Sequence, residues 1–300
     1  MKLRLVLAAL ALSVVLAAPA AAQAPERVVA FTPFTANVLV DLGVTPVAVG
    51  DAPAGEVDPR LDDVPRLKLA HPNGPNLEQL LALRPDVVFS SPVWRPGTPR
   101  IQRLGIEVYD GYDPQRLSTI GLNVGYIAEK VGRAAQGRAL AARLNREIRR
   151  ASKLKSNAEW KCDAARRGPR VLLVMGLARY TMAILGKSWG ADVICAAGGR
   201  MVTNDIQPIG RTGEGTVVGN LSNEKVVQLN PDIIVVVPHG NANEVAKIAA
   251  YYRSFRPWRT TKAAKKGRIY VPTDDNLLQA SSDPAAVIRE VRRDILKRRR

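Results

Sequence analysis

Several side chains that could bind a metal-containing or flat anionic molecule lie in loops that follow predicted strands. The chain has two histidines, His71 and His239, and each follows an apolar run. A neutral imidazole can ligate iron, although an imidazole satisfied by hydrogen bonds within the fold is the simpler interpretation of either one. Arginines beside aromatic rings suit a flat or catecholate anion, because a guanidinium group adds cation–π contact to bidentate hydrogen bonds. The candidate ligand-binding residues are Phe34, His71, Trp94, Arg95, Tyr112, Arg179, Tyr180, Arg211 and His239, with Arg200 and Asp274–Asn276 as further members.

These loops connect strands and helices that alternate along the chain. Short apolar or β-branched runs predict strands at Arg27–Phe31, Val47–Val49, Asp86–Phe89, Ile106–Tyr109, Arg170–Met175, Asp232–Val237 and Arg268–Val271. Helical patterns lie between most of them, and this alternation favours parallel, doubly wound α/β sheets. Ligands of such sheets bind outside the carboxyl ends of the strands. The candidate residues should therefore line one shared cleft if the chain forms two such lobes.

An internal repeat indicates that the chain does form two lobes. The segment Asn76–Phe89 matches the segment Ser222–Val235 without a gap. Each copy has a cap-type residue, a glutamate in the first helical turn, an apolar stripe, a proline that ends the helix and a buried strand. Glu78 and Glu224 are the two glutamates, placed where they complement the helix dipole. Two copies in register predict a pseudo-symmetric protein with one α/β lobe on either side of the middle segment.

The middle segment, from about Leu117 to Leu154, predicts one long amphipathic helix. Apolar residues recur at steps of three, four or seven on one face, and the other face is basic. We expect this helix to join the lobes as a stiff strut, with residues 23–116 as the N-terminal lobe, 117–155 as the connecting helix and 156–300 as the C-terminal lobe. A helical hairpin or a coiled-coil segment is the alternative interpretation of the same apolar stripe.

Residues 1–22 predict a secretory signal peptide. A basic start is followed by an apolar run that ends in the small residues Ala20–Ala22. No cysteine lies near the expected cleavage site to accept a lipid, so we expect a mature protein that diffuses freely in a periplasm. In that oxidising compartment Cys162 and Cys195, the two cysteines of the chain, are expected to form a disulfide. Two buried free thiols are the alternative.

The formal net charge of +17 favours anionic partners. The basic residues are dispersed over the middle helix, Arg166–Arg170, Lys262–Arg268 and the C-terminal tail, so a solvated basic surface is the simplest interpretation of most of them. Nucleic acid is disfavoured as a partner, because the chain carries an export signal and lacks a basic stripe with interleaved stacking aromatics.

Sequence motifs of common enzymes are absent. The chain has no GxGxxG after its first strand, no phosphate loop, no nucleophile elbow and no HExxH. Asp51, Asp58, Asp62 and Asp63 resemble a cluster of metal ligands, but they alternate with prolines in a loop, where aspartates more often make turns. We therefore expect no catalysis and no metal site belonging to the protein itself. A secreted α/β enzyme is the alternative class.

Taken together, these segments resemble the periplasmic substrate-binding proteins of the helical-backbone class, which feed ABC importers for cobalamin, ferric siderophores and haem. The resemblance covers essentially all of the sequence after the leader and rests on Arg27–Pro33, Leu77–Phe89, the middle helix, Ala197–Gly199, Ser222–Val236, Arg268–Pro272 and Gln279–Pro284. It implies two α/β lobes with the ligand cleft between them, an importer permease and ATPase as partners, and a monomer without an intrinsic cofactor. That family docks on permease arginines through one glutamate on each lobe, which assigns docking to Glu78 and Glu224, although dipole complementation would explain either one alone.

The resemblance also limits the transported ligand to an iron chelate or a corrinoid. A ferric siderophore with several negative charges, or the propionates of haem, would suit the arginine and aromatic loops. One histidine could then be an axial or sixth ligand of iron, with Tyr112 or Tyr180 opposite. Cobalamin is the alternative ligand. It is disfavoured because Asn276 stands where cobalamin receptors carry an aromatic residue, and because the loop Arg200–Gly219 is longer than theirs.

Overall fold

The computed structural model describes most of the chain that follows the expected leader. The described residues are 24–51, 56–111, 113–153, 167–177, 180–203, 205–209, 218–240, 242–272 and 274–297. The expected signal peptide lies outside them, as do Tyr112, Cys162, Arg179 and Arg211. Among the helices formed by the described residues, none is long and apolar enough to cross a bilayer.

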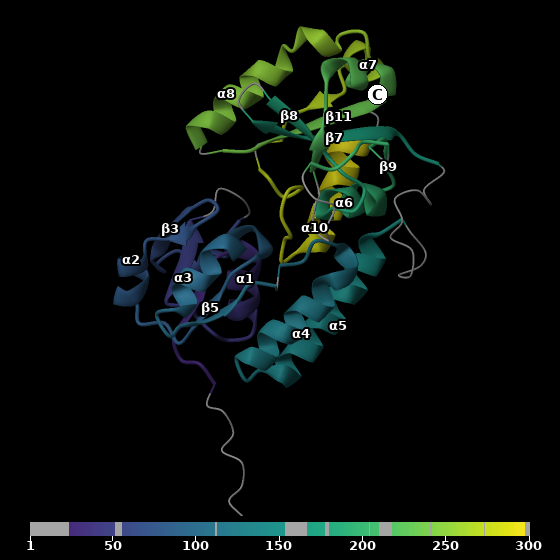
Figure 1. Cartoon of the computed structure of the whole chain (residues 1–300). Coiled ribbons are helices and arrows are strands. Elements are labelled where there is room, and N and C mark those ends of the chain that lie inside the picture. The colour runs from purple at the N-terminus through teal and green to yellow at the C-terminus, as the bar shows by residue number, and fades with distance from the viewer. Residues whose placement is uncertain are drawn as a thin grey trace, which may run out of the picture.

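The N-terminal lobe is built on a six-stranded sheet in the order β4-β3-β2-β1-β5-β6 (Figure 1). Its strands are β1 (Val28–Ala30), β2 (Ala48–Asp51), β3 (Arg66–Ala70), β4 (Gly74–Pro75), β5 (Val87–Phe89) and β6 (Glu107–Tyr109), and only the β3–β4 pair is antiparallel. Its helices are α1 (Pro33–Asp41), α2 (Leu77–Ala82) and α3 (Thr98–Gln102), with 3₁₀ helices at Pro59–Leu61 and Pro92–Gly97. α1 begins at Pro33 because the side chain of Thr32 accepts a hydrogen bond from the Thr35 amide and caps the helix.

The C-terminal lobe has a second sheet in the order β10-β8-β7-β11-β12, with β9 also paired to β7 (Figure 1). Its strands are β7 (Arg170–Leu177), β8 (Tyr180–Ile184), β9 (Arg200–Met201), β10 (Val218–Asn220), β11 (Ile233–Pro238) and β12 (Ile269–Tyr270). Its helices are α6 (Trp189–Ala197), α7 (Asn223–Leu229), α8 (Ala242–Arg253), α9 (Lys262–Lys265) and α10 (Pro284–Glu290), with a 3₁₀ helix at Arg256–Trp258 and a π-helical turn at Val291–Leu296. β8 returns antiparallel beside β7, and β10 is antiparallel to β8, so this sheet is mixed rather than all parallel.

The prediction of two α/β lobes is confirmed, but the prediction of one continuous connecting helix is wrong. A 3₁₀ turn at Leu117–Thr119 leads into α4 (Ile120–Lys130), and α5 (Ala134–Ala151) folds back against α4 as a hairpin (Figure 1). The chain turns at Gly132, whose φ of 67° is one that glycine adopts without strain. Gly137 lies so close to Ala128 that any side chain there would overlap it. Small residues on the facing surfaces therefore let the two halves of the apolar stripe pack against each other.

The hairpin joins the hydrophobic cores of the two lobes. Successive residues of a strand face opposite sides of a sheet, so Val28 and Ala30 belong to one apolar cluster and Val29 to another. The first cluster continues through the hairpin, at Ile120 and Leu144 among others, into the C-terminal lobe. The outer face of each sheet is covered separately, by α2 and α3 in the N-terminal lobe and by α7, α8 and α9 in the C-terminal lobe.

Two arginines fix the open end of the hairpin to the C-terminal lobe. Arg116 lies just before α4 and forms a bidentate pair with Asp192 of α6, at 2.8 Å and 2.7 Å, while the Leu117 amide donates to the same carboxylate at 3.0 Å. Arg292 donates to the carbonyl oxygens of Ala151, at the end of α5, and of Ala196, near the end of α6. Because last-turn carbonyls of a helix lack partners within it, this one guanidinium satisfies two helix ends and holds them together.

Candidate ligand-binding site

The C-terminal lobe presents His239 and Tyr180 at one edge of its sheet. His239 follows the last residue of β11, and its backbone amide donates to the Gly176 carbonyl of β7 at 2.9 Å. Tyr180 opens β8 opposite Leu177, and its side chain is 75 % exposed. The Tyr252 hydroxyl of α8 donates to the Tyr180 carbonyl at 2.9 Å and fixes the start of that strand. Three adjacent strands therefore place an imidazole and a phenol at the carboxyl ends of β7 and β11, where the sequence predicted them.

The N-terminal lobe presents His71 and Trp94 at the corresponding edge. His71 follows β3 and is exposed, and its ring packs edge-on against Trp94 with the centroids 5.6 Å apart. Trp94 belongs to the 3₁₀ helix after β5 and is 7 % exposed, so most of its ring fills the outer core of the lobe. Trp94 therefore packs against the imidazole of His71 and exposes little of its own surface to a ligand.

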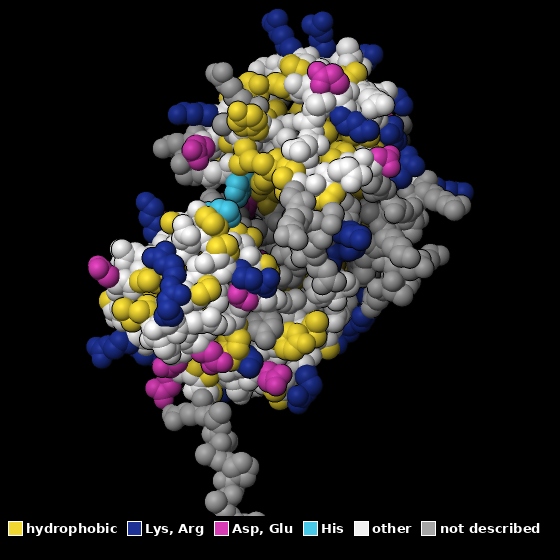
Figure 2. Space-filling model, viewed as in Figure 1, with side chains coloured by type: hydrophobic (Ala, Val, Ile, Leu, Met, Phe, Trp, Pro, Cys, Tyr) yellow, Lys and Arg dark blue, Asp and Glu magenta, His cyan; other side chains and the backbone are white. Residues whose placement is uncertain are grey.

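The two histidines lie close together although they come from different lobes. They form one cyan patch at the junction of the lobes in Figure 2. His71 is near enough to act electrostatically on His239, and burial together with His71 lowers the pKa of His239, against an opposing effect of Glu244. Among the described residues, none forms a hydrogen bond with the buried Nδ1 atom of His239. His239 is therefore a neutral imidazole at pH 7, which is the form of histidine that ligates metals.

Other predicted ligand-binding residues have different surroundings. Phe34 is 2 % exposed and fills the core at the start of α1. Arg95 is exposed, but its Nε lies 3.4 Å from an Asp110 carboxylate oxygen, so it is partly neutralised. Arg200 opens β9 beside Arg170, at the amino end of β7, which is the end of the sheet away from His239. We therefore remove Arg200 from the site and assign Phe34 mainly to packing.

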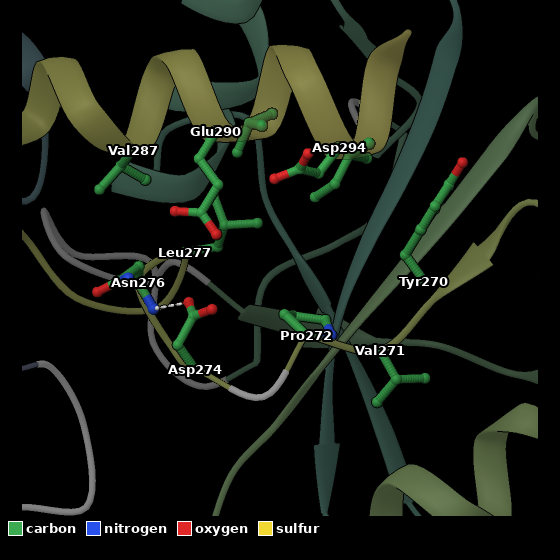
Figure 3. Close-up of a pocket in the computed structure, with 11 residues that line it drawn as sticks. Tyr270, Val271, Pro272, Asp274, Asn276, Leu277, Val287, Glu290 and Asp294 are labelled. Carbon is green, nitrogen blue, oxygen red and sulfur yellow. Dashed lines mark hydrogen bonds between the residues drawn. The ribbon is translucent and has the colours of Figure 1, made fainter. Parts of the chain in front are cut away.

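Figure 3 shows a second feature, a cavity of about 280 Å³ in the C-terminal lobe, lined by residues between Tyr270 and Leu277 and by α10 with the turn that follows it. Glu290 reaches from α10 toward Asp274 in this view, and burial together with the carboxylates of Asp274, Asp294 and Glu56 raises the pKa of Glu290. An adjoining cavity of about 320 Å³ lies between the lobes and shares Glu290 with the first. These carboxylates would repel an anionic ligand, so neither cavity suits a ferric siderophore or the haem propionates.

The cluster of carboxylates formed by Glu56, Asp274, Glu290 and Asp294 was not predicted from the sequence, although one sequence pattern indicated part of it. Glu290 and Asp294 are four residues apart, which places both on one face of the last helix. Glu56 comes from the other lobe, and no sequence pattern connects it with them. Asn37 bridges the lobes beside them, because its Nδ2 donates to the Ser282 hydroxyl at 3.1 Å. Such pairings across 245 residues come from the tertiary fold alone.

Glu78 and Glu224, the predicted docking residues, occupy equivalent positions on the outer layers of the two lobes. Both are exposed, and both lie in the first turn of a short helix capped by the preceding Asn76 or Ser222. The Glu224 amide and the Ser222 side chain lower the pKa of the Glu224 carboxyl, so it is ionised at neutral pH. Elsewhere, Cys195 lies buried in α6 and is disulfide-bonded, and its expected partner is outside the described residues.

We expect Gly97→Ala to disturb the N-terminal side of the site. A Cβ at Gly97 would overlap the Asn73 carbonyl, so the 3₁₀ helix with Trp94 and the turn with His71 would have to separate. Such overpacking typically costs about 1–3 kcal/mol, and urea denaturation would measure the loss. Gly111→Ala is the control, because a Cβ there meets nothing within 4 Å. Equal stabilities for the two variants would contradict this packing.

Comparisons with known proteins agree with this architecture. A periplasmic binding protein family model matches residues 28–275. The high-affinity heme uptake system protein IsdE of Staphylococcus aureus is 28% identical over 217 residues, which cover 70% of this chain and 67% of the relative. The crystal structure of S. aureus IsdE complexed with heme superposes with a TM-score of 0.72 at 23% identity, covering 91% of this chain and 99% of that one. The periplasmic vitamin B12 binding protein BtuF of Vibrio cholerae gives a TM-score of 0.65 at 17% identity, covering 90% and 96%.

The family model spans both lobes and the helical hairpin, and the structural matches share the two-lobed fold. The family model describes periplasmic binding proteins, and a structural neighbour from Listeria monocytogenes, 22% identical, is an ABC transporter substrate-binding protein. The chain therefore belongs to the periplasmic binding protein family.

Proposed function

We propose that this protein captures a haem-like iron chelate between its lobes and delivers it to an importer permease and ATPase in the inner membrane. The observation that supports this cargo most strongly is His239, a neutral, half-buried imidazole that lies close to His71 at the junction of the lobes. The names of relatives point the same way, because IsdE is a heme uptake protein. Haem and ferric siderophores share ferric iron and anionic groups. Haem, or a chelate that leaves a coordination position of the iron open, would use an imidazole here.

Each lobe would contribute a different kind of contact to the cargo. His239 would ligate the iron, and His71, exposed and supported by Trp94, would approach from the opposite lobe. Tyr180, 75 % exposed at the edge of the C-terminal lobe, would pack against the flat part of the ligand or approach the iron. Arg95 and the predicted Tyr112, Arg179 and Arg211 would pair with its anionic groups. Glu78 and Glu224 would dock on the permease, with the receptor acting as a periplasmic monomer released from its signal peptide.

We expect the purified mature protein to shift the visible absorption band of added ferric haem. His239→Ala should weaken haem binding by at least about tenfold, because even partners that only orient a metal ligand contribute roughly 10–100-fold. His71→Ala is the matched control, since it removes the other histidine, and its effect should be smaller. Affinity should stay constant above pH 6.5 and fall below it, because the lowered pKa keeps His239 unprotonated until the solution is acidic.

Parallel titrations with a ferric catecholate and with cobalamin identify the cargo class, because the three ligands have different visible spectra. No spectral change and no thermal stabilisation with any of them would contradict the receptor function. Haem binding that His239→Ala leaves unchanged would contradict only the assignment of this ligand.

A further inference from the structure

The C-terminal lobe carries a concentrated basic segment that ligand capture does not use. No acidic residue occurs between Glu244 and Asp274. Within this stretch a cation recurs at every third position, and all five are exposed. We call this set the basic ridge; it consists of Arg253, Arg256, Arg259, Lys262 and Lys265.

The three-residue spacing has a structural cause. Three of the ridge cations, Arg253, Arg259 and Lys262, directly follow residues that pack inward. These residues are Tyr252, Trp258 and Thr261, which are at most 1 % exposed. The inward rings contact one another, with Tyr252 stacked on Trp258 at a centroid distance of 5.6 Å. The cations are therefore carried by folded elements that pack on the core. These elements are the end of α8, the 3₁₀ helix Arg256–Trp258 and α9.

The charge of the ridge is not neutralised within the part of the chain that the structure describes. None of its cations forms an ion pair with a described residue, whereas Arg143 of α5 pairs with Asp41 at 3.1 Å. In the N-terminal lobe, the exposed Arg95 likewise pairs with Asp110. Five unpaired like charges on adjoining turns repel one another and favour an anionic partner.

The position of the ridge indicates which partner that is. Trp258 donates from Nε1 to the side chain of Asn223 at 2.9 Å, and the Lys262 amide donates to the side chain of Asn230 at 2.8 Å. Both contacts tie the ridge to α7, the helix that carries Glu224. In Figure 2 dark-blue side chains gather over this end of the lobe. A receptor that docked on a permease through Glu224 would therefore bring the ridge close to the surrounding lipid headgroups.

Other anionic partners fit the ridge less well. Nucleic acid binding would need several well-exposed aromatic rings for stacking, but Tyr252 and Trp258 are buried and Tyr251 is 36 % exposed. The anionic cargo would bind at the strand ends beside His239, whereas the ridge follows residues that pack in the outer apolar layer on one face of the sheet. A bilayer surface requires only several cations on one exposed face, which is what the ridge supplies.

We propose that the basic ridge binds the anionic phospholipid surface of the membrane and so holds the receptor near its permease, an inference that rests on the proposed function. Lipid contact through the ridge increases the local concentration of receptor at the bilayer and orients Glu224 toward the membrane. Weak binding suffices, because the receptor must also diffuse to collect its ligand.

The test is flotation of the ligand-free protein with protein-free vesicles of phosphatidylcholine, with or without phosphatidylglycerol. Each cation near an anionic surface contributes about fivefold to binding, so Arg253→Gln/Arg256→Gln/Arg259→Gln should lower it by about a hundredfold. The matched control is Arg138→Gln/Arg146→Gln/Arg149→Gln, which removes three exposed arginines from α5. The control should lower binding by less than about fivefold, and added salt should abolish binding of the wild type.

Equal losses in the ridge and α5 variants would overturn the proposal, because binding would then depend on net charge alone. Equal binding to vesicles with and without phosphatidylglycerol, or none to either, would overturn it as well. Thermal melts confirm that each variant is folded, and Lys262→Gln/Lys265→Gln repeats the test at the other end of the ridge. Haem titration of the wild-type protein keeps the two proposals apart: flotation without haem binding contradicts the cargo, and haem binding without flotation contradicts the ridge. The ridge variants should bind haem as the wild type does.

Discussion

Arg116→Ala should destabilise the protein by about 3–5 kcal/mol, because it leaves a buried carboxylate without its partner. The Asp192 side chain is fully buried, whereas the Arg116 side chain is 28 % exposed. Arg116 also lies where the N-terminal lobe leads into the hairpin, so its loss frees the hairpin from α6 as well as breaking the ion pair. Chemical denaturation monitored by circular dichroism measures the change in the free energy of unfolding.

Asp192 is more deeply buried than Arg116, so removing either partner of this ion pair should have a different effect on stability. Asp192→Asn leaves a guanidinium that water can still reach, so it should cost less than Arg116→Ala. Burial raises the pKa of Asp192 even in the intact protein. A raised carboxyl pKa means that the folded state binds protons more tightly than the unfolded state, so stability falls as pH rises above about 4. Without Arg116 this effect should grow, and the deficit of Arg116→Ala should be larger at pH 8 than at pH 5. A deficit independent of pH would show that Asp192 is not the group left unpaired.

The hairpin still serves as a rigid connector, although it is not the single helix that the sequence predicted. Its turn lies beside the N-terminal lobe, where Lys130 lies 4.5 Å from the Tyr109 ring centroid, and Arg143 in the middle of α5 pairs with Asp41 of the same lobe. Its open end is held to the C-terminal lobe by Arg116 and Arg292. One apolar cluster runs through all three parts. A connector packed against both lobes should permit only small closure when ligand binds, as the single-helix interpretation also implied.

Local patterns predicted those parts of the fold that depend on neighbouring residues. The alternation of apolar runs located β1, β5, β7 and β11, and the repeat around Glu78 and Glu224 predicted two lobes. Periodicity could not distinguish a straight helix from a hairpin, because both bury the same apolar stripe. The deciding information was the positive φ of Gly132 and the contact between Gly137 and Ala128, which joins residues on different helices.

The site was predictable to the extent that topology determines it. Parallel strands place their carboxyl ends at one edge of a sheet, and this rule placed His239 correctly as the residue that follows β11. His71 follows β3, a strand that was not predicted from the sequence. The rule failed for Arg200, because the short strand β9 presents it at the opposite end. Sequence gave no indication that the Nδ1 atom of His239 lacks a hydrogen bond among the described residues, since that depends on how the lobes pack.

Charge reversal at both predicted docking residues, Glu78→Lys/Glu224→Lys, should abolish uptake and leave ligand affinity within about twofold of the wild type. Each exposed carboxylate would meet a permease arginine in the docked complex, and placing like charges opposite each other costs several kcal/mol. Both residues lie on the outer layers of the lobes, away from the histidines, so the ligand site should not change. Uptake of the labelled ligand by cells, with ligand binding measured on the purified variant, tests both parts.

The control must separate docking from two other effects of the same substitution, the change in net charge and the loss of dipole complementation. Asp62→Lys/Glu129→Lys makes the same charge change at exposed sites elsewhere, so a similar loss of uptake would contradict docking. A carboxylate that only complements a helix dipole contributes about 0.3–1 kcal/mol to stability, which thermal unfolding would detect without any effect on uptake. Glu78→Gln/Glu224→Gln removes both charges without adding repulsion, and should therefore reduce uptake less than the reversal does. Only docking through these two glutamates predicts this graded loss at unchanged affinity.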